Sequence, residues 1–173
     1  MESETFSYDA RGIANFLLDY ADSKSVSISL LPLIKVIFYA HGWYLVKFER
    51  PLVKQTFEAW EHGPVIRVLW EVLRGFGKEP IVARRATARD LLTNKQEVVS
   101  VEFPDSVSSF LKNIFDAYGQ ISAWKLSDMT HEPESPWDRK WNSESGKVSL
   151  GMRISDEEIR KWFNEQRFFT TPQ

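Results

Sequence analysis

The sequence predicts a mainly α (α+β) fold: a compact single helical domain around a buried central hydrophobic helix, with a small β-strand pair or hairpin. The segment Leu33–Val46 is apolar on every face over helical length, which indicates a buried helix. In several flanking stretches apolar residues recur at i, i+3, i+4 and i+7, which is typical of amphipathic helices. The chain has 173 residues, 43% of them hydrophobic, enough for one core. We therefore expect a single domain over residues 1–173.

The first part of the chain is expected to hold two helices. Apolar residues at helical spacing over Ala10–Tyr20 predict a helix with one buried stripe. Ser29 stands where its side chain can cap the central helix. That helix should end near Phe48, because Pro51 disfavours helical conformation just before it. Lysines near both of its ends exclude a membrane span, which needs about 20 uninterrupted apolar residues.

The middle of the chain carries weaker patterns. Phe57–Trp60 alternates between apolar and polar residues and predicts a short extended segment. Gly63 and Pro64 predict the start of a helix, with the proline at its first position. Residues 78–95 are polar and without pattern. The composition of Val98–Phe103 is typical of a strand.

The last third again predicts helices. Val107–Tyr118 gives the cleanest amphipathic pattern, and Ser122 can cap a further short helix that runs through Met129. His131–Pro136 is expected to be a rigid loop because it contains two prolines. Ser155–Glu158 has the form of a capping box at the start of a final helix. That helix should bury Ile159, Trp162 and Phe163.

Composition excludes several classes of protein. The chain has no cysteine, so disulfides, thiolate zinc sites and cysteine nucleophiles are excluded. Its acidic start lacks the apolar region of a secretion signal, and we expect a cytoplasmic protein with no membrane contact. The net charge of -2 says little about partners. The nearest approach to a basic face is Arg84, Arg85, Arg89 and Lys95, which Asp90 interrupts and which is more typical of a solvated loop, so we expect no nucleic-acid partner.

The histidines are the first candidates for chemistry. The three are His41, His62 and His131, and their spacing matches no compact metal-binding signature, so we expect no metal and no cofactor. Glu58 and His62 could lie close enough to form a general base, or they could simply fix a turn. Neither a nucleophile motif nor a phosphate-binding loop accompanies them. We therefore expect no enzyme, and a hydrolase centred on these four residues is the less favoured alternative.

The seven tryptophans are more informative. Trp137 and Trp141 flank a polar stretch, and two interpretations remain open for them. They could anchor a protein interface, in which tryptophan and arginine are enriched, or they could close over the core. The other five are expected in the core: Trp43, Trp60, Trp70, Trp124 and Trp162.

Several spaced segments together resemble a known family. They are an apolar run from Lys35 that ends in HGWYL, the dipeptide Pro51-Leu52, FEAWEHGPV over Phe57–Val65, and a stretch over Tyr118–Trp137 that ends in THEPESPW. In this order they resemble the Panacea antitoxin domain, the SocA-like or phage-associated GepA-like family. The chain departs from the family pattern in a loop, where Glu49-Arg50 replaces a frequent glycine, and at His62, which replaces an aromatic residue.

The resemblance implies an antitoxin of a toxin–antitoxin system. Such a protein neutralises a cognate toxin, usually encoded by the adjacent gene, by direct protein–protein binding. One class of family members acts instead as a proteolytic adaptor that presents a bound toxin to a ClpXP-type protease, which is the main alternative. Other members carry a DNA-binding segment, but we expect no operator binding here.

The motif residues are the candidates for partner binding under this resemblance. They comprise the residues His41, Trp43, Tyr44, Glu58, Trp60, His62, Gly63, Pro64, His131, Glu134, Pro136, Trp137 and Trp141. An exposed aromatic edge of Trp137, Trp141 and the loops after Trp60 is the expected contact surface. A second interpretation is that the motifs are shared because the core needs them. Recognition would then lie in less patterned parts of the chain, residues 78–95 included.

Overall fold

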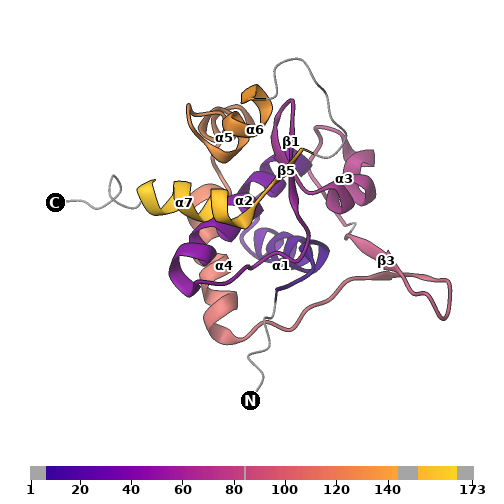
Figure 1. The fold of residues 1–173 in the computed structure, drawn as a ribbon. Helices are drawn as coiled ribbons and strands as arrows, with labels where there is room; N and C mark the ends of the chain where they lie inside the picture. The colour runs from indigo at the N-terminus through magenta and orange to yellow at the C-terminus, as the bar shows by residue number, and fades with distance from the viewer. Residues whose placement is uncertain (1–6, 84, 144–151, 167–173) are drawn as a thin grey trace.

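Helix α2 (Leu30–Phe48) runs through the middle of the molecule, and the other helices pack around it (Figure 1). The computed structural model describes residues 7–83, 85–143 and 152–166. Residues 32–42 form an unbroken buried run, which confirms the central helix that the apolar pattern predicts. The helix ends at Phe48 as expected, where Glu49 adopts a left-handed conformation with φ 56°. The capping prediction is wrong: Ser29 occupies the cap position, but its side chain makes no capping hydrogen bond.

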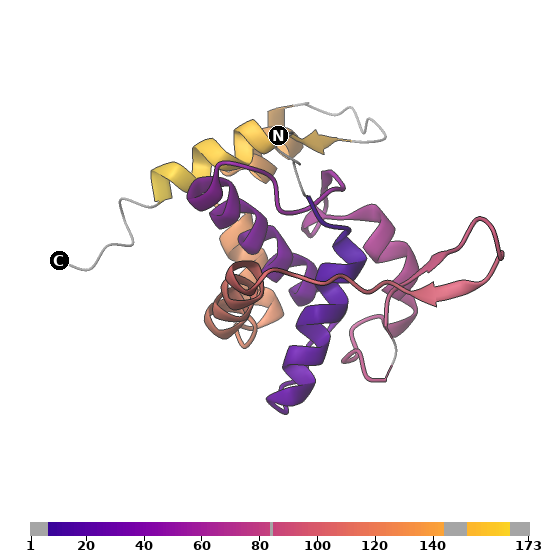
Figure 2. The same ribbon diagram turned by 90° about the horizontal axis from the view of Figure 1, so that it is seen from below.

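The remaining helices form a ring around α2 (Figures 1 and 2). Helices α1, α4, α5 and α7 contact α2 directly, whereas α6 packs against the small sheet and α7. In the described residues, no helix is both long and apolar enough to cross a membrane. The bounds are α1 (Ala10–Ser23), α4 (Asp105–Tyr118), α5 (Ala123–Thr130), α6 (Pro136–Ser143) and α7 (Asp156–Gln166).

A three-stranded antiparallel sheet lies beside α2 and has the order β2-β1-β5. Its strands are β1 (Phe57–Trp60), β2 (Gly63–Val65) and β5 (Arg153–Ile154). The prediction of a helix start at Gly63 and Pro64 is therefore wrong. Pairing with β1 overrides the local proline signal, since Pro64 lies opposite Ala59 and Gly63 takes φ +106° to close the turn. The helix that follows, α3 (Arg67–Leu73), begins later and continues into a short 3₁₀ turn, Arg74–Phe76.

A separate hairpin of β3 (Thr87–Arg89) and β4 (Gln96–Val98) projects from the body of the molecule (Figure 2). The strand expected over Val98–Phe103 is thus wrong in its bounds, because β4 begins earlier and ends at Val98. The following residues run along α1 instead, and Phe103 packs against the rings of Tyr8 and Phe16.

The C-terminal predictions are confirmed in detail. Ser122 caps α5 by accepting a hydrogen bond from the Lys125 N–H at 3.2 Å. In the capping box of α7, the Ser155 N–H donates to Glu158 Oε2 at 3.1 Å and the Glu158 N–H donates to Ser155 Oγ at 3.2 Å. The stripe of α7 is buried as expected at Ile159, Trp162 and Phe163. Residues 1–6, on which the expected lack of a signal sequence depends, lie outside the described residues.

Candidate functional site

The HGWYL segment lies on the last turns of α2 and holds neighbouring elements in place. His41 is buried, and its Nδ1 accepts a hydrogen bond from the Val53 N–H at 3.1 Å. Because a backbone N–H can only donate, Nε2 carries the ring hydrogen and donates to Asp156 Oδ1 at 2.8 Å. His41 therefore ties the loop after α2 and the first residue of α7 to the central helix, and both of its nitrogens are occupied.

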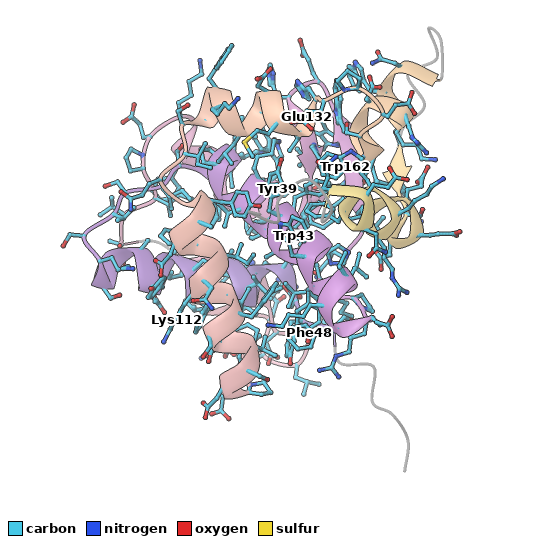
Figure 3. The ribbon with its side chains drawn as sticks, turned by 90° about the vertical axis from the view of Figure 1, so that its left-hand side faces the viewer. Tyr39, Trp43, Phe48, Lys112, Glu132 and Trp162 are labelled. Atoms are coloured by element: carbon cyan, nitrogen blue, oxygen red, sulfur yellow. The ribbon has the colours of Figure 1, made fainter. Side chains whose placement is uncertain are left out.

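The next residues of the motif set the contact between α2 and α7. A Cβ atom at Gly42 would lie 2.2 Å from Cε2 of Phe163, so only glycine allows this approach. The ring of Trp43 meets Phe163 edge to face at 5.0 Å, and its Nε1–H donates to Tyr118 Oη at 2.9 Å. Figure 3 shows Trp43 between Tyr39 and Phe48 along α2. Tyr44 is buried against Phe48, and its hydroxyl has no hydrogen-bond partner among the described residues.

The turn between β1 and β2 sits on a buried lysine. Lys35 is only 2% exposed, and its Nζ donates to the Pro64 carbonyl oxygen at 3.1 Å. Burial lowers the pKa of Lys35 to about 7. A Cβ at Gly63 would lie 2.8 Å from Lys35 Nζ and from Thr130 Oγ1, so the turn packs tightly against both. Lys35 was not among the candidate site residues, although a lysine inside an all-apolar helix is itself a signal of a special role.

His131 and the two tryptophans of α6 form one stack beside this turn. The His131 ring lies 3.8 Å from Trp137, which lies 5.7 Å from Trp141. Trp137 is only 7% exposed, and its Nε1–H donates to the Trp60 carbonyl oxygen at 2.6 Å. Burial, and then the charge on Lys35, lower the pKa of His131. Trp137 therefore closes over the core, and the expected exposed edge is wrong for this ring; Trp141 is half-buried.

The loop before α6 is fixed by its own hydrogen bonds. Ser135 is buried, and its hydroxyl donates to the Thr130 carbonyl oxygen at 2.9 Å. Pro136 is buried at the first position of α6, as its fixed φ allows. Glu134 is exposed with φ 67°, and its carboxylate pairs with Arg139 at 3.1 Å. Of the candidates in this loop, Glu134 is thus accessible to a partner.

Glu58 pairs with an arginine rather than a histidine. Its carboxylate accepts hydrogen bonds from Arg67 at 3.1 and 2.7 Å and from Trp60 Nε1 at 2.9 Å. Burial alone would raise the pKa of Glu58, but these bonds outweigh it and lower the pKa below its usual value. A carboxylate held in this way is a weak base, and it is not directed at His62, which is exposed in the turn.

The three histidines have different surroundings. His41 joins α2 to α7 and has both ring nitrogens bonded, whereas His62 is exposed and His131 stacks on Trp137. Besides burial and the charge on Lys35, the charge on nearby His62 also lowers the pKa of the His131 ring. Over residues 7–83, 85–143 and 152–166, no group of three or more His, Asp or Glu side chains could hold a metal ion.

Exposed rings do gather around the β1–β2 turn, although one of them was expected elsewhere. Trp124 on α5 is 76% exposed, so its expected place in the core is wrong. It lies one helical turn before Ser127, whose hydroxyl donates to the His62 carbonyl oxygen at 3.3 Å. Arg67 lies 5.5 Å over the half-buried ring of Trp60. We call the exposed and half-buried side chains around this turn the turn surface: Trp60, His62, Arg67, Trp124 and Trp141.

Comparisons with known proteins identify the same family that the spaced motifs of the sequence resemble. The family model described as "Antitoxin SocA-like, Panacea domain" matches residues 33–138, from α2 to α6. The protein named Antitoxin SocA of Caulobacter vibrioides (strain NA1000 / CB15N) is 35% identical over 161 residues, which cover 93% of this chain and 85% of that protein. No solved structure matches the chain.

Proposed function

The chain belongs to the SocA-like Panacea antitoxin family, and on this premise we propose that it neutralises a toxin protein by binding it directly. The observation that carries the proposal is the 35% identity to an antitoxin along 93% of the chain. The toxin is the product of the adjacent gene, and binding takes place in the cytoplasm. The chain acts as a stoichiometric binder rather than as an enzyme.

The burial pattern supports binding rather than catalysis. The polar groups of the motifs are used inside the fold: His41 holds α7, Lys35 holds the β1–β2 turn and Trp137 holds β1. A catalytic site needs a nucleophile, a base and a place for substrate within reach of one another. Here His41 and Glu58 are held by structural partners, so neither is free to act as a base.

We propose the turn surface as one contact with the toxin. Tryptophan and arginine dominate the binding energy of protein interfaces, and this surface holds three tryptophans and Arg67. The surface has rigid support, because buried Lys35 and Trp137 bond to the backbone directly beneath it. A rigid aromatic surface loses little entropy when a partner covers it.

Co-expression tests the proposal. We expect the adjacent gene product alone to stop growth, and this chain to restore growth and to co-purify with that product. Trp124→Ala should weaken binding at least about tenfold, since the ring makes a large exposed contact. Lys112→Ala, on the outer side of α4 (Figure 3), is the matched control and should bind as the wild type does. A harmless neighbour, or one that the chain neither binds nor counteracts, would contradict the proposal.

A second experiment in the same cells separates simple neutralisation from the adaptor alternative. In simple neutralisation the bound toxin persists, and the complex can be recovered from growing cells. In the adaptor role the lifetime of the toxin shortens when this chain is present, and the shortening requires a ClpXP-type protease. A pulse-chase of the toxin in cells with and without that protease distinguishes the two outcomes.

A further inference from the structure

The β3–β4 hairpin carries an unusual pair of side chains at its tip. Leu91 and Leu92 are 94% and 96% exposed. Four of the five large apolar side chains that are exposed in the described part of the chain lie between residues 82 and 98: Val82, Leu91, Leu92 and Val98. Central positions of turns usually hold glycine, proline, asparagine, aspartate or serine. Two adjacent leucines in water at this place contribute nothing to the core.

The turn that presents these leucines is well ordered by its own hydrogen bonds. The Asp90 N–H donates to the Lys95 carbonyl oxygen at 2.9 Å, and Asp90 Oδ1 accepts from the backbone N–H groups of Leu92 at 2.8 Å and Thr93 at 2.7 Å. Asn94 adopts φ 58°, which closes the turn. Asparagine tolerates this left-handed conformation better than most residues do. The leucines therefore project from a defined backbone.

The base of the hairpin is fixed firmly to α1. Buried Asn15 donates from Nδ2 to the carbonyl oxygens of Ala86 and Val99, both at 2.8 Å, and its Oδ1 accepts from the Ala86 N–H at 2.7 Å. One side chain thus binds both strands where they leave the body of the molecule. Arg85 adds ion pairs with Asp19 and Asp22 on the same helix. The base of the hairpin is therefore anchored on α1, and its two strands project from the body of the molecule (Figure 2).

We propose that Leu91 and Leu92 are a second anchor for the toxin and insert into an apolar pocket of that protein. This inference rests on the proposed function and adds to it a site on a different element from the turn surface. A projecting turn that ends in two exposed leucines is suited to a concave apolar partner, because both side chains leave water when the tip enters a pocket.

Charge favours a protein pocket over a membrane. From Ala86 to Val98 the hairpin carries Arg89 and Lys95 but also Asp90 and Glu97, so it has no net charge to attract an anionic membrane. A second copy of this chain offers an open groove of about 480 Å³ between the start of α2 and the start of α5. Self-association is therefore measured below as an outcome that would overturn the inference.

The test compares three variants of the full chain for affinity to the purified product of the adjacent gene. Leu91→Ser with Leu92→Ser should weaken binding by about 100-fold, because two apolar anchors are lost. Leu91→Met with Leu92→Met keeps the apolar contact and should bind within about threefold of the wild type. Val82→Ser, which removes an exposed apolar group outside the tip, is the matched control and should bind normally.

The outcomes separate this inference from the function it rests on. If the wild type binds and the double serine variant binds equally well, the tip is not an anchor and the antitoxin proposal stands. If the wild type does not bind the product at all, the proposed function fails and the anchor fails with it. Sedimentation of the chain alone, and with vesicles of phosphatidylglycerol and phosphatidylethanolamine, completes the test. Self-association or vesicle binding that the double serine variant abolishes would assign the tip to another occupant and overturn the inference.

Discussion

Helix α2 and the β3–β4 hairpin are opposites in pattern and in burial. The helix contains the HGWYL motif, and its residues 32–42 are buried without interruption. The hairpin has no motif, and residues 91–98 are all exposed. This difference favours the interpretation that the buried motif residues serve the fold. We propose that the contacts with a partner fall on exposed side chains, both in the β1–β2 turn and in the hairpin.

We expect the largest loss of stability from a substitution at Gly42. Gly42→Ala places a methyl group against the ring of Phe163 and should lower the free energy of unfolding by about 3 kcal/mol. Urea unfolding measures this loss. Phe163→Leu in the same chain should restore part of it, because the smaller side chain leaves room for the methyl group. Wild-type stability in Gly42→Ala would show that α2 and α7 do not pack as described.

Buried Lys35 should make the stability of the protein depend on pH. Burial lowers the pKa of Lys35 from 10.5 to about 7, so between these values the unfolded chain binds more protons there than the folded protein does. The free energy of unfolding should therefore rise with pH in this range, by about 2 kcal/mol from pH 7.5 to 9. The lowered pKa of His131 affects the free energy of unfolding below pH 6.5, which is outside the range from pH 7.5 to 9.

Lys35→Met removes the titrating group and should flatten the rise between pH 7.5 and 9. Denaturant titrations at several pH values measure the slope for both proteins. Tyrosine ionisation does not contribute to the slope between pH 7.5 and 9. Burial raises the pKa of Tyr39 above its usual value, and the pH range ends before free tyrosine ionises. An equal slope in the wild type and the variant would mean that Lys35 is not the buried amine described here.

Two tryptophans give the finest test of the difference between core and surface. Trp137→Phe loses the hydrogen bond to the Trp60 carbonyl oxygen and some packing volume, and should cost about 1–2 kcal/mol of stability. Trp124→Phe is the same change on an exposed ring and should cost less than about 0.5 kcal/mol. Thermal unfolding of the two variants compares them directly. Equal losses would contradict the assignment of one ring to the core and the other to the surface.

Sequence reasoning succeeded where local signals and burial agree. The bounds of α2 follow from apolar residues on all faces and from Pro51, and the capping box of α7 is a purely local feature. Prediction from the sequence failed where pairing with another segment determines the local structure. Gly63 and Pro64 form β2 because β1 is available to pair with them. A strand as short as β5, Arg153–Ile154, leaves no pattern to read.

The candidate site was predicted less well than the fold. The roles of the motif residues depend on partners far away in sequence, such as Asp156 for His41. Trp124 is exposed although it was expected in the core, and of the two interpretations open for Trp137 the structure shows the one in which the ring closes over the core. Short helices such as α5 and α6 carry too few residues to define a buried face from the sequence. The hairpin tip was included only as part of an unpatterned stretch, and exposed leucines become informative once the backbone that presents them is known.

Amide hydrogen exchange of this chain, alone and with the purified product of the adjacent gene, locates the surface that the toxin covers. We expect binding to slow exchange in the hairpin tip, residues 90–95, and around the β1–β2 turn, residues 60–63. Exchange in α2 should stay as slow as it is in the free protein, because that helix is already buried. A complex that protects neither the tip nor the turn, or no complex at all, would contradict the account.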